Sequence, residues 1–290
     1  MRIELAGTLI QPDPLVVKYI ANDNFIPADY MDLGYTHFDV ICIGGGGGMG
    51  GGIDTANTGT LIRSYGGAGG GGGFHRISGL LAALPGSCPV VVGAGGSLGT
   101  EHASNPALTT DGGDGGASSF NATTCRASGG KGGKRVQTNS VTTSTLANGG
   151  DGGVGNRVIA GGGGSGGLAG TPTATGPGTS GTKGEDGTFF QGIGEGGGGG
   201  AGGVGKYGGV TCNAATAGGR GSYNPGDTSV YGPGGIPSSD ASSGAANVKP
   251  GGASGAKAAP LNGLPTVYGL SKGVRAISDP GVVILRLTAE

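Results

Sequence analysis

The stretch HFDVICIGGGGGMGGG, residues 37–52, contains the point at which the composition of the chain changes. Its first part, His37–Ile43, is apolar and rich in residues that favour β-strands. Its second part is almost all glycine, which buries little apolar area and loses more backbone entropy on folding than any other residue. A run of glycines cannot form a core of packed side chains. We therefore place the boundary between an ordinary region and a glycine-rich region at Ile43–Gly44.

Glycine is distributed unevenly over the whole chain. The sequence has 290 residues and 76 glycines, and residues 1–43 hold only Gly7 and Gly34. The glycine content of the remaining residues is about four times the usual value of roughly 7%. The sequence therefore indicates an ordinary N-terminal part followed by a long glycine-rich body.

Charge and hydropathy exclude several classes of partner. The 17 basic and 18 acidic residues give a formal net charge of -1. Proteins that bind nucleic acids or anionic membranes usually carry a surplus of basic residues, so we expect neither as the main partner. No run of about 18 apolar residues is present, so we expect no membrane insertion. Residues 1–20 lack the continuous apolar core of a secretory signal, so we expect none.

Within the body, several seven-residue blocks repeat glycine pairs with a period of three. This period matches the three residues per turn of a polyproline II helix, whose backbone groups point outward and can bond to neighbouring helices. We therefore predict a packed body of polyglycine-II-like helices; the alternative is a flexible tether, which has no need for the period. The blocks are DGGDGGA (111–117), SGGKGGK (128–134), NGGDGGV (148–154), GGGSGGL (162–168) and GGGAGGV (198–204).

Ordinary strands frame this body, which predicts an all-β and otherwise irregular fold. Pro12 and Pro14 separate two N-terminal candidates, and a helical turn is expected at Leu80–Leu84, before Pro85. We expect the last strand to join the first ones, so that a small β core carries the glycine helices. The predicted strands are Arg2–Ile10, Leu15–Ile20, His37–Ile43, Cys88–Gly93 and Gly281–Leu287, with weaker candidates at Thr60–Tyr65 and Phe74–Ile77.

These boundaries suggest four regions. Residues 1–35 form an N-terminal docking segment, and residues 36–100 form the β core with glycine loops. Residues 101–270 form the body of glycine helices and loops, and residues 271–290 supply the C-terminal strand that closes the core.

No motif with chemical meaning stands out from the glycine background. G-x-S-x-G occurs around Ser97 and Ser165, but glycine frequency alone accounts for both, and no convincing helix follows Ser97. No phosphate-binding G-x-x-x-x-G-K-[ST] is completed. We therefore expect no enzymatic activity and no cofactor.

Cysteine and histidine spacing gives no metal signature either. The cysteines lack C-x-x-C spacing and the histidines are isolated, so we expect no metal site. Cys42 and Cys88 lie in apolar strands and are predicted to act as small buried hydrophobic residues. The residues concerned are Cys42, Cys88, Cys125 and Cys212 with His37, His75 and His102.

Three tyrosines are candidates for recognition. Tyr207, Tyr223 and Tyr231 lie in segments rich in Gly, Asn and Pro. Tyrosine with Ser, Gly and Asn is typical of adaptable binding surfaces, so these residues are candidates for receptor binding. The alternative, that their rings cap glycine helices and supply apolar burial, stays open.

Several pieces of sequence, in this order and spacing, resemble the glycine-rich minor tail proteins of siphophages, notably those that infect actinobacteria. Each piece is of low complexity, and together they cover the chain from about residue 24 to its end. The pieces are Asn24–Ala28, Phe38–Gly48, Pro89–Gly96, Asp114–Phe120 and Pro280–Leu287.

The resemblance implies a structural component of the virion at the tail tip, assembled in the host cytoplasm, which contributes to attachment to the host envelope. Its implied partners are other phage tail proteins and a host cell-surface receptor, and many such fibres are homotrimers. The alternative is a bacterial cell-surface glycine-rich structural protein. Residues 1–23 lie outside the resemblance and are our candidates for tail docking, in particular Leu9, Ile10, Val16, Val17, Tyr19 and Ile20.

Overall fold

The computed structural model describes residues 11–51, 69–100, 109–135, 278 and 280–289, and elsewhere the backbone pairing of short strands. Most of the regular structure in these residues is β-strand. The short strands outside the continuous ranges are β1 (Glu4–Leu5), β2 (Thr8–Leu9), β6 (Ile53–Thr55), β7 (Ile62–Ser64), β12 (Thr188–Phe190), β13 (Ile193–Glu195), β14 (Lys206–Tyr207), β15 (Ser222–Tyr223) and β16 (Val230–Tyr231).

One four-stranded antiparallel sheet joins the two ends of the described chain. Its strands, in spatial order, are β3 (Leu15–Tyr19), β17 (Val282–Thr288), β5 (His37–Ile43) and β8 (Phe74–Leu80). β17 therefore lies between two N-terminal strands, and most of its residues are buried. The prediction that the C-terminal strand joins the N-terminal strands is confirmed.

A second antiparallel sheet packs against the first across a common core. Its order is β4 (Asp23–Phe25), β9 (Cys88–Val91), β10 (Ser118–Phe120) and β11 (Cys125–Ala127). The ring centroids of Phe25 and Phe120 are 5.7 Å apart, and those of Phe38 and Phe120 are 6.2 Å apart. The core residues from both sheets include Phe25, Phe38, Val40, Val90, Phe120, Leu285 and Leu287.

Two short helical elements close one end of this core. α1 (Pro27–Met31) has proline in its first turn, where the missing N–H is not needed and the fixed φ suits a helix. η1 (Leu81–Ala83) packs against α1, and Leu81 is fully buried. We call the two sheets with α1 and η1 the β base.

Several sequence predictions can be compared with these elements. The strand predicted at 37–43 is confirmed as β5, and the helical turn predicted at 80–84 is confirmed as η1. The strand predicted at 74–77 is longer and reaches Leu80. The stretch 2–10, expected as one strand, instead contains the paired strands β1 and β2.

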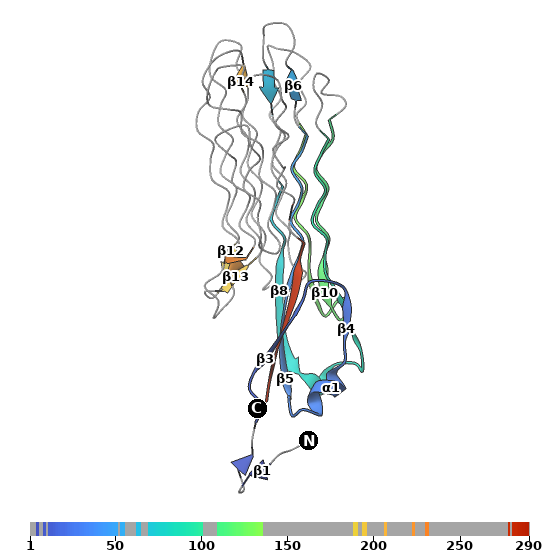
Figure 1. The fold of residues 1–290 in the computed structure, drawn as a ribbon, viewed down its shortest axis with the longest axis vertical. Helices are drawn as coiled ribbons and strands as arrows, with labels where there is room; N and C mark the ends of the chain where they lie inside the picture. The colour runs from blue at the N-terminus through green and yellow to red at the C-terminus, as the bar shows by residue number, and fades with distance from the viewer. Residues whose placement is uncertain are drawn as a thin grey trace.

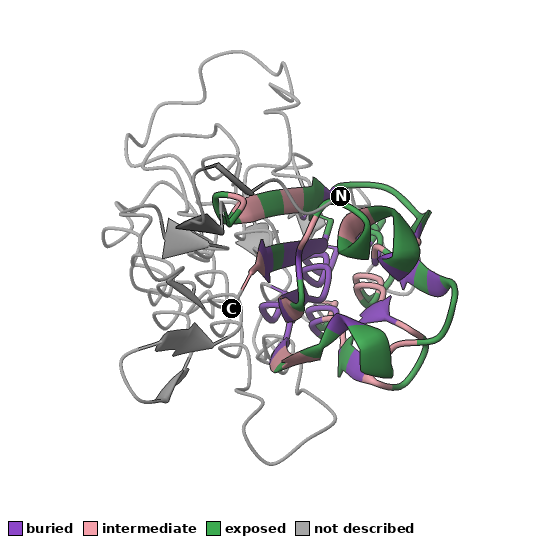
Figure 2. Cartoon of the chain, turned by 90° about the horizontal axis from the view of Figure 1, so that it is seen from below, coloured by how far each residue is buried: buried purple, intermediate pink, exposed green. Residues whose placement is uncertain are grey.

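Extended segments leave the β base at one end and run along the long axis of the molecule (Figure 1). At the opposite end Leu15 lies beside Leu287, so the described chain enters and leaves the β base away from these segments. Seen along this axis, buried residues gather near the middle of the view, and much of the outer ribbon of the β base is exposed (Figure 2). None of the described residues belongs to a helix long and apolar enough to span a membrane.

Candidate functional site: the glycine bundle

Five glycine-rich segments lie side by side above the β base, and we call them the glycine bundle (Figure 1). Each continues a strand of one of the two sheets, so the sheets fix where the segments begin. In the described residues they contain neither helix nor strand. The segments are 44–51 after β5, 69–73 before β8, 93–100 after β9, 109–117 before β10 and 128–135 after β11.

Segment 44–51 is completely buried and donates backbone hydrogen bonds to two neighbours. Gly44 and Gly47 donate to the carbonyls of Gly73 and Gly70, at 2.9 and 2.8 Å. Three further bonds lead to segment 109–117, with N···O distances of 2.9–3.0 Å. Their donors are Gly45, Gly48 and Gly51, and their acceptors are Gly116, Gly113 and Thr110. Both neighbours run antiparallel to segment 44–51, because the partner number falls as the donor number rises.

The same segment accepts hydrogen bonds from two other neighbours. Gly96 and Gly99 donate to the carbonyls of Gly46 and Met49, both at 2.8 Å. Gly130 and Gly133 in segment 128–135 donate to the carbonyls of Gly45 and Gly48, at 2.9 and 2.8 Å. These two neighbours run parallel to segment 44–51. A β-strand pairs only at its two edges, so bonds to four neighbours exclude a simple continuation of the sheets.

The outer segments also bond to one another in steps of three residues. Gly113 and Gly116 donate to the carbonyls of Ser97 and Ala94, both at 2.7 Å. The C-terminal segment follows the same step, because Gly281 donates to the carbonyl of Gly93 and the Ser278 hydroxyl donates to that of Gly96. The chain just before β17 thus also packs against the bundle.

Side-chain volume is excluded where these backbones touch. A Cβ on Gly115 would overlap the carbonyl oxygen of Gly45, and a Cβ on Gly48 would overlap that of Ser97. Because the obstacle is backbone on both sides, no change of rotamer can make room. Glycine is therefore required here for space rather than for an unusual φ.

Exposure along the outer segments has the same period. In segment 93–100, Gly93, Gly96 and Gly99 are buried, whereas Ala94, Ser97 and Thr100 are exposed. In the next two segments exposed charged side chains are also three residues apart, at Asp111 and Asp114 and at Lys131 and Lys134. Segments 93–100, 109–117 and 128–135 thus each present side chains to solvent with this period, whereas segment 69–73 is buried throughout.

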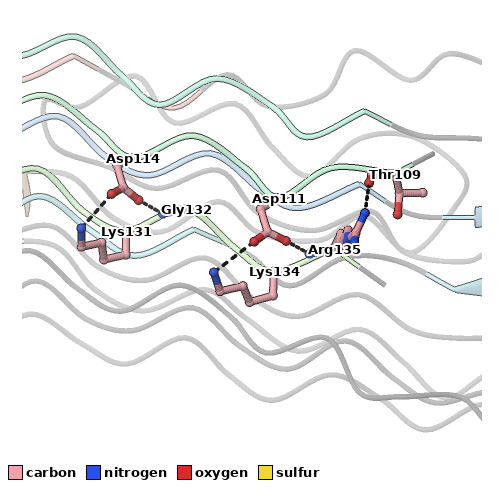
Figure 3. A network of polar contacts seen from close by, with 7 residues as sticks. All are labelled: Thr109, Asp111, Asp114, Lys131, Gly132, Lys134 and Arg135. Carbon is pink, nitrogen blue, oxygen red and sulfur yellow. Dashed lines mark hydrogen bonds and ion pairs between the residues drawn. The ribbon is translucent and has the colours of Figure 1, made fainter. Parts of the chain in front are cut away.

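Two of these rows form a ladder of ion pairs (Figure 3). Lys131 Nζ lies 2.7 Å from Asp114 Oδ2, and Lys134 Nζ lies 3.0 Å from Asp111 Oδ2. Each carboxylate also accepts a backbone N–H, from Gly132 at 2.9 Å and from Arg135 at 2.8 Å.

The ladder changes the acidity of its carboxyl groups. Partial burial alone would raise the pKa of Asp111, but hydrogen bonds from the Arg135 N–H and from Lys134 outweigh it, so this pKa is lowered. For Asp114, the bonds from Lys131 and from the Gly132 N–H likewise outweigh burial and lower the pKa. Both carboxylates are thus stabilised in their charged form.

A polar cluster lies inside the β base. The Cys42 thiol donates to the carbonyl of Cys125 at 3.6 Å, and the Cys125 thiol donates to the carbonyl of His75 at 3.4 Å. The Arg126 N–H donates to His75 Nδ1 at 3.0 Å, so the ring proton of this buried histidine is on Nε2. Burial raises the pKa of the Cys42 thiol. The cluster belongs to the packed core.

The cysteines, histidines and serines considered in the sequence lie partly in the core and the bundle and partly outside the described residues. Cys42 and Cys88 are buried among apolar side chains, as predicted. No group of three or more His, Cys, Asp or Glu side chains in the described residues is arranged to hold a metal ion. Ser97 lies in the bundle, and no helix follows it within segment 93–100. Cys212, His102 and Ser165 lie outside the described residues.

The three candidate receptor-binding tyrosines all lie in short strands. Tyr207 ends β14 and is opposite Ile62 of β7. Tyr223 and Tyr231 lie in the paired strands β15 and β16, which brings them to one two-stranded sheet. Their side chains are outside the described part of the protein, so their role stays a prediction.

The candidate docking residues in β3, and Ile20 just after it, differ in burial. Tyr19 is buried in the core and Val17 packs against it, and burial raises the pKa of Tyr19 to about 12. Val16 and Ile20 are exposed. Leu9 lies in β2 with its side chain outside the described part, and Ile10 is also outside it. The exposed Lys18 was not among the sequence candidates, although period-two alternation places it on the face of Val16.

No family model matches this sequence, and neither does any of the curated proteins compared with it.

Proposed function

We propose that this protein is a structural component of a phage tail tip that contributes to attachment to the host-cell envelope. In this proposal the bundle is a set of packed polyglycine-II-like helices, and the further glycine blocks between residues 136 and 270 extend it. The observation that carries the proposal is the hydrogen bonding of segment 44–51 to four neighbours in three-residue steps. Backbone bonding of this kind is suited to a stiff element made from a chain with few large side chains.

The arrangement of the two regions suggests how such a component works. The described chain enters and leaves the β base at the end opposite the bundle. The β base would attach to other tail proteins, in a homotrimer, and the bundle would project away from the attachment point. Contact with a host receptor would then involve exposed side chains of the bundle and its connecting segments. This role is mechanical and needs no catalytic group.

Immunogold labelling of intact particles from the source system tests this proposal. Antibodies against the purified protein are applied to particles and to uninfected cells, and both are viewed by electron microscopy. Label at the distal end of a phage tail is the expected result. Label on uninfected cell surfaces, with none on particles, would overturn the proposal in favour of a bacterial cell-surface structural protein.

A deletion separates an adhesive role from a purely structural one. Residues 207–236, which contain Tyr207, Tyr223 and Tyr231, are removed and adsorption of the resulting particles is measured. We expect reduced adsorption with normal particle assembly. Unchanged adsorption would remove this segment from receptor binding and leave the scaffold role.

A further inference from the structure

We propose that the outer edge of β3 binds an extended segment of a different protein, which adds to the β3-β17-β5-β8 sheet as a further strand. The proposal rests on the proposed function, in which the β base is attached to neighbouring tail proteins, and it defines the chemistry of that neighbour. The segment expected is apolar at two positions four residues apart, with an acidic residue midway between them.

The first observation is the position of β3 in the sheet. β3 pairs with β17 on one side, and none of the described strands pairs with it on the other (Figure 1). An edge strand has a row of backbone N–H and C=O groups that can bond to another extended chain. Peptides commonly bind in this way: the backbone bonds provide affinity and alternate side chains provide specificity.

The second observation is the pattern of side chains on this edge. Val16 and Ile20 are 61% and 73% exposed, and the exposed Lys18 lies between them. Leu15 and Val17 point the other way and pack against the core. β3 ends at Tyr19, and Ile20 lies directly after it. The exposed side chains along this edge and just beyond its end are therefore apolar, cationic and apolar in turn, and exposed apolar residues on an unpaired edge favour pairing with another chain.

The third observation is the charge on the same face of the sheet. Arg286 of β17 lies between Val16 and Asp39 and is exposed. The Asp39 carboxylate is already bound by two guanidinium nitrogens of Arg76, at 2.7 and 2.5 Å. In the described part of the chain neither Lys18 nor Arg286 forms an ion pair. Among the described residues of this face positive charge is in excess, and an acidic residue opposite Lys18 would neutralise it.

The same pattern disfavours a second copy of this protein as the occupant. If two copies paired antiparallel along β3 so that Val16 of one lay opposite Ile20 of the other, just beyond β3, Lys18 would lie opposite Lys18. Like charges directly opposite each other destabilise a strand pair. A heterologous strand with an acidic centre fits the edge better.

Titration of the full-length protein with designed extended peptides tests this assignment. The probes are two nine-residue peptides with the central pattern Val-Thr-X-Thr-Ile, in which X is glutamate or lysine. We expect the glutamate peptide to bind more tightly by about three- to tenfold, because it gains an attraction to Lys18 where the lysine peptide meets a repulsion. The substitution Lys18→Glu should reverse this preference. Arg126→Glu, the same charge change at an exposed residue of β11, is the matched control and should leave it unchanged.

Backbone methylation of the glutamate peptide distinguishes strand addition from contact through side chains alone. Two versions are made, with N-methyl groups on the odd or on the even residues, so that one version blocks the edge facing β3. Loss of binding by one version and not the other is expected. Equal binding by both versions, or no binding of the unmethylated peptide at millimolar concentration, would overturn the proposal. These results do not depend on particle labelling, so the tail-tip proposal and the edge proposal can fail separately.

Discussion

The β base and the glycine bundle are adjacent parts of one chain that are held together by opposite means. In the β base, large side chains such as Phe25, Phe120 and Leu285 are buried between two sheets. In the bundle, segment 44–51 is equally buried, but its contacts are backbone hydrogen bonds and its one large side chain, Met49, contacts Leu98. Removal of atoms should therefore damage the β base, and addition of atoms should damage the bundle.

The comparison also shows how the two parts depend on each other. A glycine segment loses much backbone entropy when it is ordered, and alone it offers little apolar burial in return. Here each described segment of the bundle is attached to a strand whose position is already fixed by the core. The β base therefore reduces the entropy that the bundle must lose.

The largest effect is expected from Gly115→Val in the bundle. The new Cβ would overlap the Gly45 carbonyl oxygen, and neither backbone can move without breaking its own hydrogen bonds. We expect a loss of more than about 4 kcal/mol of stability, or local loss of the bundle. Thermal unfolding and limited proteolysis measure these effects.

The matched control for this change is Gly86→Val. Gly86 is exposed in the β base, and a Cβ there meets no atom within 4 Å. The control should unfold and resist protease like the unmodified protein. If Gly115→Val behaved like the control, the close packing of segments 44–51 and 109–117 would be contradicted.

In the β base the damaging change is the reverse, from large to small. Phe120→Ala removes a fully buried ring that contacts Phe25 and Phe38. We expect a loss of about 3–5 kcal/mol, measured by denaturant unfolding. Val16→Ala, on the exposed face of β3, should change stability by no more than about 0.5 kcal/mol. Similar losses for both variants would mean that the core does not lie between the two sheets.

The sequence predicted the β base and the bundle unequally well. β5 and β17 could be recognised because each is a seven-residue stretch rich in β-forming residues; β5 borders a glycine run and β17 follows Pro280 and Gly281. α1 and β10 were missed, because five and three residues are too short to display a helical or strand period. In β3, alternation separates Val16 from Val17, but it does not tell which face is buried.

In the bundle, the three-residue period was visible only where other residues interrupt the glycines. DGGDGGA and SGGKGGK display it, whereas the glycine run after β5, interrupted once by Met49, does not. Segments 44–51, 69–73 and 93–100 were therefore interpreted as loops. In the structure they bond in the same three-residue steps as segment 109–117. The ion-pair ladder could not be predicted, because it depends on two segments being antiparallel neighbours.

A smaller effect, confined to the bundle, is expected from acid. The pKa values of Asp111 and Asp114 are lower in the folded protein than the ordinary 3.8. Their contribution to stability is therefore complete above about pH 5 and is lost as the pH falls through the folded values. Both ion pairs are partly exposed, so each is worth no more than about 1 kcal/mol.

Hydrogen exchange at several pH values measures this contribution. Below pH 5 the protection factors in segment 109–117, which correct for the slower intrinsic exchange in acid, should fall more than those in β5. The double variant Asp111→Asn, Asp114→Asn should remove the difference. Asp13→Asn, an exposed carboxylate of the β base, is the control. A pH response that is equal in both regions would show that the ladder does not stabilise the bundle.

The smallest effect concerns the turn between β10 and β11, where glycine is missing although the backbone would suit it. Ala122 has φ of 57° and Asn121 has φ of 49°. This left-handed conformation costs alanine roughly 1–2 kcal/mol, whereas asparagine tolerates it. Ala122→Gly should relieve this strain and, after the added entropy of the unfolded chain, stabilise the protein by about 0.5–1 kcal/mol. A raised melting temperature is the expected result, and a lowered one would contradict the left-handed turn. Glycine thus serves two purposes here: in the bundle it leaves room for a neighbouring backbone, and in this turn it would only relax a dihedral angle.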